Sequence, residues 1–219
     1  MKSQWATLSR NDWGELLELS RKKAFQRKFQ IVEAFIGLVA AKGLQHVTPA
    51  LIAEKCGITR PLVKHHFPSE KDLILLSYRY AYARFQKRAS DGLMAKSGIT
   101  RQLRGYLDAV ADWTHEHQDD ARFLVQFAAS RQLKLEYSKL YQRNVQIGQE
   151  RIVALFMAAQ AKEKLPPLTE KQLFRRVRLI QMLIAGILVG FSTNEDGKLT
   201  AADRDDLWAG TQAILGMRL

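Results

Sequence analysis

The sequence lacks most of the features that would indicate a secreted or a membrane protein. It has one cysteine, Cys56, among 219 residues, which excludes an intrachain disulfide. No apolar run follows the N-terminus, so we expect no signal peptide. The most apolar stretch, residues 179–191, contains Gln181 and is shorter than the ~18 residues of a membrane span. We therefore expect a soluble cytoplasmic protein that does not enter a membrane.

The sequence also lacks the motifs of common enzymes. There is no cysteine cluster, no glycine-rich phosphate loop and no nucleophile elbow. His115 and His117 are two residues apart, so on a helix they point to different sides and do not form a pair of zinc ligands. We expect no catalytic residue, no metal and no cofactor, and a protein that is not an enzyme.

Positive charge is abundant and unevenly distributed. The formal net charge is +12. Residues 21–71 carry ten basic and three acidic side chains, whereas residues 72–219 carry 22 basic and 16 acidic side chains. This concentration in the N-terminal third is what neutralisation of nucleic-acid phosphates requires.

Residues 47–67 have the pattern of a helix-turn-helix. Thr48 is suited to cap a first helix, and Gly57 provides the left-handed backbone of a sharp helix exit. Thr59 then caps a second helix that runs to His66. Five prolines in the whole chain leave long helices possible elsewhere.

The second of these helices separates apolar from cationic side chains. Ile58, Val63 and Phe67 face inward by their spacing, which leaves outside Thr59, Arg60, Lys64, His65 and His66. A short helix with such a free face suits the DNA major groove. The alternative is a solvated face on an ordinary helical hairpin.

Over residues 25–75 the sequence resembles, without gaps, the N-terminal domain of the tetracycline-repressor (TetR) family. The matching segments are residues 39–43, 47–48, 52–59 and 65–73. The sequence departs from the family pattern at Pro61, Leu62 and Lys64. For DNA contact we select Thr48, Thr59, Arg60, Pro61, Leu62, Lys64, His65, His66 and Lys71. Arg60 and Lys64 are assigned to bases, and Thr48, His65, His66 and Lys71 to phosphates.

The remaining chain reads as further helices with no strand pattern. We predict an all-α fold of about nine to ten helices, with an N-terminal three-helix helix-turn-helix DNA-binding domain and a C-terminal helical domain. The predicted divisions are an N-terminal extension or basic arm at 1–23, the DNA-binding domain at 24–75, and a ligand-binding and dimerisation domain at 76–219.

The N-terminal extension leaves two questions open. A short amphipathic helix, residues 12–19, either packs on the body of the protein or forms a loose arm. Five cations follow within residues 21–28, and they either contact phosphate or the minor groove, or form a solvated charge run.

The C-terminal region has an apolar helix that needs cover on more than one side. Residues 179–191 are apolar almost all round, which indicates either burial within a monomer or half of a four-helix bundle between subunits. The family resemblance implies a homodimer, which we place on the helices near 136–164 and 169–192.

The resemblance also implies a small-molecule effector bound in the C-terminal region. Candidate lining residues, each of which could equally be ordinary core, are Trp113, Phe123, Gln126, Phe127, Arg131, Tyr137, Tyr141 and Met182. The predicted function is a homodimeric transcription regulator, a repressor released from a palindromic operator by an effector. An activator, an architectural or cell-cycle DNA-binding protein without effector, and a helical protein-interaction module remain alternatives.

Overall fold

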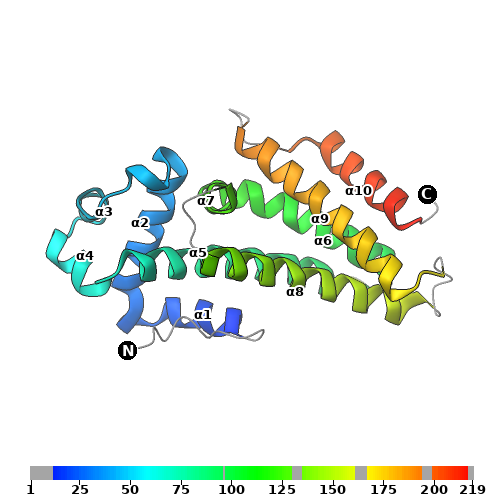
Figure 1. Cartoon of the computed structure of the whole chain (residues 1–219), viewed down its shortest axis with the longest axis horizontal. Coiled ribbons are helices and arrows are strands. Elements are labelled where there is room, and N and C mark those ends of the chain that lie inside the picture. The colour runs from blue at the N-terminus through cyan, green and yellow to red at the C-terminus, as the bar shows by residue number, and fades with distance from the viewer. Residues whose placement is uncertain (1–11, 96, 130–134, 161–166, 194–198, 217–219) are drawn as a thin grey trace. The chain divides into compact units, whose positions relative to one another are not determined.

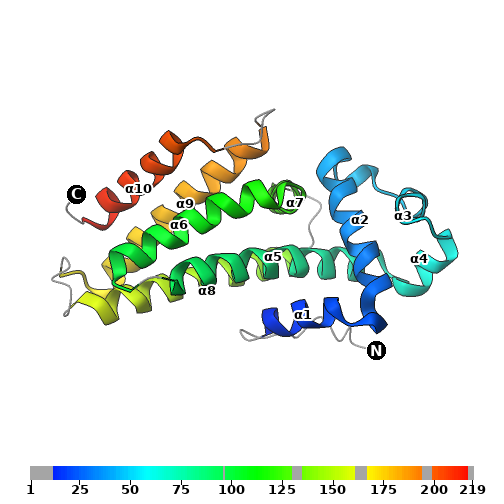
Figure 2. The same cartoon turned by 180° about the vertical axis from the view of Figure 1, so that it is seen from behind.

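The protein is helical throughout the residues that the computed structural model describes, which are 12–95, 97–129, 135–160, 167–193 and 199–216 (Figures 1 and 2). The helices of these ranges are α1 (Asp12–Arg21), η1 (Lys23–Phe25), α2 (Gln26–Lys42), η2 (Leu44–His46), α3 (Pro49–Cys56), α4 (Arg60–His66), α5 (Glu70–Met94), α6 (Ile99–Glu116), α7 (Gln118–Ala129), α8 (Leu135–Gln160), α9 (Glu170–Thr193) and α10 (Ala201–Leu215). The predicted all-α fold is confirmed. None of the described helices is long and apolar enough to cross a membrane.

The chain divides into two compact units. The first contains the residues up to Lys87 together with the segment from His117, and the second contains Arg88–Glu116 and the residues after 134. The first unit is larger than residues 24–75 because α7 and most of α5 belong to it as well. The predicted divisions at residues 23 and 75 stay predictions.

Helix α2 is the centre of the first unit. Figures 1 and 2 show α3 and α4 on one side of α2 and α7 on the other. Phe35 of α2 meets Phe123 of α7 edge to face, with 6.1 Å between ring centroids. Tyr78 of α5 stacks on Phe127 of α7 at 4.2 Å. Aromatic packing therefore fixes α7 to the elements that carry the helix-turn-helix.

The N-terminal helix α1 packs on this unit rather than standing free. The Trp13 ring lies edge-on to Tyr82 of α5, with 5.5 Å between centroids. Leu16 is only 1% exposed. One of the two open alternatives for residues 12–19 is thereby decided, because the buried Leu16 and the half-buried Trp13 hold α1 in place. Residues 1–11 lie outside the described part of the chain.

The second unit is a four-helix arrangement of α6, α8, α9 and α10, in which each helix packs against two of the others. A reciprocal cap fixes the start of α9. The Gln172 backbone N–H donates to Thr169 Oγ1 at 3.3 Å, and the Thr169 N–H donates to Gln172 Oε1 at 2.9 Å. Thr200 and Asp203 form the same motif at the start of α10.

A buried ion pair joins α5 to α7 within the first unit. Asp120 is 2% exposed, and its Oδ1 accepts a hydrogen bond from Arg84 Nη2 at 2.5 Å. Its Oδ2 has no hydrogen-bond partner among the described residues. Burial raises the pKa of Asp120 to about 6, because loss of hydration outweighs the attraction of Arg84.

We expect Asp120 to make the protein less stable as the pH rises from 4 to 7. The pKa of this carboxyl is higher in the folded protein, about 6, than the usual 3.8. The folded state therefore binds more protons in this window, and the free energy of unfolding falls with rising pH. The difference between the two values corresponds to about 3 kcal/mol.

The Asp120→Asn variant keeps an oxygen acceptor for Arg84 and removes the titration. Urea denaturation of both proteins at several pH values measures the effect. The stability of the wild type relative to the variant should fall by up to about 3 kcal/mol between pH 4 and pH 7. A difference that does not change with pH would contradict the raised pKa.

Candidate nucleic-acid interface

Local backbone geometry builds the predicted helix-turn-helix. Thr48 Oγ1 accepts the backbone N–H of Leu51 at 3.3 Å and so caps α3. Gly57 ends α3 in the left-handed conformation, with φ 62°. Thr59 is the extended N-cap residue of α4, but its side chain makes no capping hydrogen bond. Both helices lie where they were predicted, and the Thr59 hydroxyl is not used as a cap.

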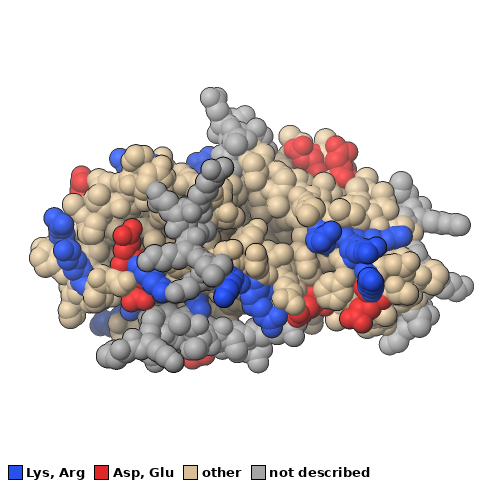
Figure 3. All heavy atoms as spheres, in the orientation of Figure 1, with Lys and Arg blue, Asp and Glu red and all other residues tan. Residues whose placement is uncertain are grey.

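Helix α4 buries one side and exposes a cationic one. Val63 and Phe67 are 2% and 6% exposed and hold the helix against the unit. The solvent-facing residues of this stretch are Thr59, Arg60, Pro61, Lys64 and His65, and the half-buried ones are Leu62 and His66. In Figure 3, lysine and arginine side chains lie over α4 at the left edge of the molecule. A face of this kind attracts nucleic-acid phosphates.

Cations from α2 surround the end of α4. Burial lowers the pKa of His66, and the nearby His65, Lys28 and Arg27 lower it further. Lys28 Nζ lies 5.0 Å from the centroid of the Phe67 ring, and burial also lowers the pKa of Lys28. His66 is therefore a neutral hydrogen-bonding group at pH 7 rather than a cation.

Two of the selected residues lie at the starts of other helices. Thr48 is exposed at the beginning of α3, and Lys71 is half-buried in the first turn of α5. For Arg27 and Lys28 the sequence left open a contact to phosphate or the minor groove and a solvated charge run, and in the structure both act electrostatically on His66. The signal for them was the run of cations in residues 21–28. The DNA-contact assignments stay predictions.

Cys56 closes α3 next to this surface. It is 8% exposed, and burial raises the pKa of its thiol. A neutral buried thiol behaves as a small apolar side chain. The described residues contain no group of three or more side chains placed to hold a metal ion.

The predicted effector residues are distributed over both units. In the first unit, Phe123 and Phe127 are core residues with 1% exposure, and Gln126 Nε2 donates to the Ala40 carbonyl at 3.3 Å. Arg131 lies outside the described residues.

In the second unit, Trp113 and Tyr137 are buried, whereas Tyr141 and Met182 are 37% and 59% exposed. A ligand site made from the predicted set stays a prediction.

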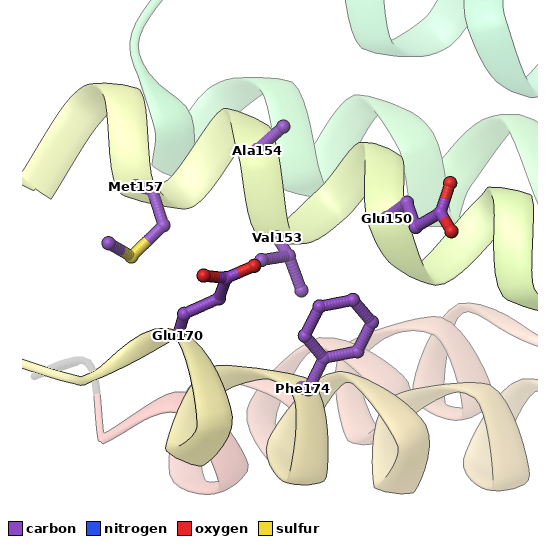
Figure 4. A pocket seen from close by; sticks show the side chains of 6 residues that line it. All are labelled: Glu150, Val153, Ala154, Met157, Glu170 and Phe174. Carbon is purple, nitrogen blue, oxygen red and sulfur yellow. The ribbon is translucent and has the colours of Figure 1, made fainter.

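A pocket of about 330 Å³ lies between α8 and α9 of the second unit. In Figure 4, Glu170 and Phe174 extend from α9 toward Val153 and Met157 of α8. The other described lining residues are Glu150 and Ala154. Glu150 also lies 3.8 Å from the Arg143 guanidinium. None of the predicted effector residues is among these side chains.

Solved structures with a similar fold are regulators of transcription. A TetR-like regulator from Rhodococcus sp. RHA1 has a TM-score of 0.70 at 15% identity, with 90% of this chain and 100% of that chain covered. A TetR regulator from Haloarcula marismortui ATCC 43049 has a TM-score of 0.73 at 15% identity, with 87% and 97% covered.

A third similar structure is described as a transcriptional regulator from Saccharomonospora viridis in complex with choline. Its TM-score is 0.70 at 20% identity, with 84% of this chain and 94% of that chain covered. No protein-family model and no curated protein matches the sequence. At these identities the likeness establishes the fold, which is that of TetR-family regulators.

We predict that the Lys28→Met variant raises the pKa of His66. The substitution removes one of the cations that disfavour imidazolium, while the methionine keeps most of the aliphatic volume. Titration of the imidazole resonances by NMR measures this pKa. Lys42→Met, on the same helix, is the matched control and should leave it unchanged. Equal behaviour of the two variants would show that Lys28 does not act on His66.

Proposed function

We propose that this protein is a homodimeric, sequence-specific DNA-binding transcription regulator. The proposal rests on the orientation of α4. Val63 and Phe67, the residue that follows the helix, are buried, so that Arg60 and Lys64 face the solvent. This face belongs to a helix-turn-helix within a fold that TetR-family regulators share. The charge distribution supports it, because residues 21–71, which contain the helix-turn-helix, carry ten basic and only three acidic side chains.

In the proposed complex, each protomer inserts α4 into the major groove. Two such helices in successive grooves on one side of a palindromic operator lie about 34–36 Å apart. Arg60 and Lys64 contact base edges, and the side chains of Thr48, His65 and Lys71 contact phosphates. His66 joins the phosphate contacts as a hydrogen-bond donor. Thr59, Pro61 and Leu62 complete the surface at the start of α4.

An exposed apolar face on α9 supports dimerisation. Leu179 and Met182 are 48% and 59% exposed, and Ala185 and Gly186 are exposed on the same side of the helix. A Cβ atom added at Gly186 would meet nothing within 4 Å. Small residues between larger apolar ones allow a second helix to approach closely, so α9 is suited to cross its copy in a partner.

We further propose that a small-molecule effector releases the protein from its operator and that the protein acts as a repressor in the cytoplasm. The Saccharomonospora viridis structure, which contains choline, supports a ligand-responsive role for this fold. Helix α5 is continuous from the helix-turn-helix unit into the second unit. An effector changes DNA binding only if it binds the two states of the dimer unequally.

Selection from a pool of random DNA duplexes at about 150 mM salt tests the central proposal, because non-specific phosphate attraction is weakened there. We expect enrichment of one inverted repeat, which would then serve as the operator in effector screening. Retention of no sequence, or of all sequences equally, would exclude the proposed regulator function but would not contradict the fold.

We expect Arg60→Ala to lower discrimination between this operator and random DNA. Loss of a bidentate contact to a base costs about 1–3 kcal/mol for the correct sequence only. Fluorescence anisotropy with both duplexes measures the ratio. Arg101→Ala removes an exposed arginine from α6 and is the matched control. Equal losses of both affinities in Arg60→Ala would show that Arg60 touches only phosphate.

We expect Met182→Asp to weaken the dimer at least about tenfold, which corresponds to about 1.4 kcal/mol. The reason is that a carboxylate would be buried against an apolar partner surface. Analytical ultracentrifugation measures the dissociation constant. Met94→Asp, at a methionine that is 75% exposed, is the control and should have no effect. Identical dissociation constants for the two variants and the wild type would exclude this face as the interface.

A further inference from the structure

A second pocket, of about 620 Å³, lies in the first unit where the end of α1, the start of α2 and α5 meet. Its size is within the range of small-molecule sites. Phe29 and Tyr80 contribute rings whose centroids are 4.9 Å apart, and Ser20 contributes a hydroxyl. None of the residues selected for DNA or effector binding lines it.

The charges of this pocket are unbalanced. Its one carboxylate, Glu33, accepts the Tyr80 hydroxyl at 2.9 Å and lies 3.7 Å from the Arg84 guanidinium. The cations Lys23 and Arg27 form no ion pair within the described part of the chain. The acidic group is thus engaged, and two positive charges face the pocket without compensation.

The adjoining helix end adds to the attraction for an anion. The first turn of α2 contains no acidic residue, and its N-cap residue, Phe25, provides no side-chain hydrogen bond. A helix start of this kind favours negative charge. Gln26 contributes an amide group that can form hydrogen bonds with oxygen atoms, whereas the amide of Gln30 is already bonded to Arg27 and to the Cys56 carbonyl.

We propose that this pocket binds a small organic molecule carrying a phosphate group. Two uncompensated cations match a phosphate monoester, which carries a charge of about −1.5 to −2 at pH 7. Arginine and lysine are the usual protein partners of phosphate. The pocket is larger than an inorganic phosphate ion requires, and the Gln26 amide, the hydroxyl groups and the aromatic rings suit an organic body.

A chain of hydrogen bonds connects the pocket to the turn of the helix-turn-helix. Arg27 Nη1 donates to Gln30 Oε1 at 2.5 Å, and Gln30 Nε2 donates to the Cys56 carbonyl at 3.4 Å. Cys56 ends α3 immediately before Gly57, where the chain turns toward α4. We call these two hydrogen bonds the tether. A phosphate that binds Arg27 replaces its hydrogen bond to Gln30 and so weakens the tether, and binding of the molecule therefore lowers affinity for DNA. This second step rests on the proposed function.

Calorimetric titration with AMP, and with adenosine as its uncharged counterpart, tests the pocket without DNA. At 150 mM salt, AMP should bind at least tenfold more tightly than adenosine, and inorganic phosphate should compete with it. Arg27→Met should weaken AMP binding at least tenfold, whereas Lys42→Met, on the same helix, should not. No binding of AMP, equal binding of adenosine, or equal losses in both variants would overturn the proposal.

The tether is tested with DNA at constant ionic strength. AMP should weaken DNA binding by the wild type at least fivefold. Gln30→Leu should still bind AMP but lose this response. An unchanged response would overturn the tether and indicate direct competition between AMP and DNA phosphates for Arg27. If the protein binds no specific DNA, the proposed function fails, while calorimetry still decides whether the pocket binds phosphate.

Discussion

The burial of α2 is the constraint on which the first unit depends. From Ile31 to Val39 all residues but Glu33 are buried, so this stretch has no apolar stripe but is covered on nearly every side. A helix of that kind needs partners all round, and here α3 covers one side and α7 another, while α4 packs on α3. The helix-turn-helix is therefore rigid because a shared core supports it, since α3 and α4 have only eight and seven residues.

Polar contacts on the edge of this core are arranged around α5. Arg84 lies over the Tyr80 ring, with 4.3 Å from its guanidinium carbon to the centroid, and also contacts Glu33 of α2 and Asp120 of α7. One side chain thus connects three helices. Because Asp120 is buried with an unpaired oxygen, this connection is costly at neutral pH, so the ion pair is not by itself a sign of added stability.

Features fixed by neighbouring residues could be predicted from the sequence, and features fixed by distant ones could not. The cap at Thr48 and the left-handed Gly57 depend on a few adjacent residues and were found in place, whereas Thr59 begins α4 without a capping hydrogen bond. The cover of α2 by α7 could not be predicted, because it comes from a segment about 80 residues away in the sequence. The pocket lined by Lys23 lies where α1, α2 and α5 meet. No local sequence motif indicates such a site, because its residues are far apart in the chain.

The state of Cys56 has a practical consequence for spectroscopy. As the one thiol of the sequence, buried and with a raised pKa, it forms little thiolate and reacts slowly with maleimides and methanethiosulfonates. A cysteine introduced on the exposed side of α4 would therefore be labelled selectively in the otherwise native chain. In the proposed dimer, one such label on each α4 would report the distance between the two α4 helices directly, without first replacing a residue that packs against α2.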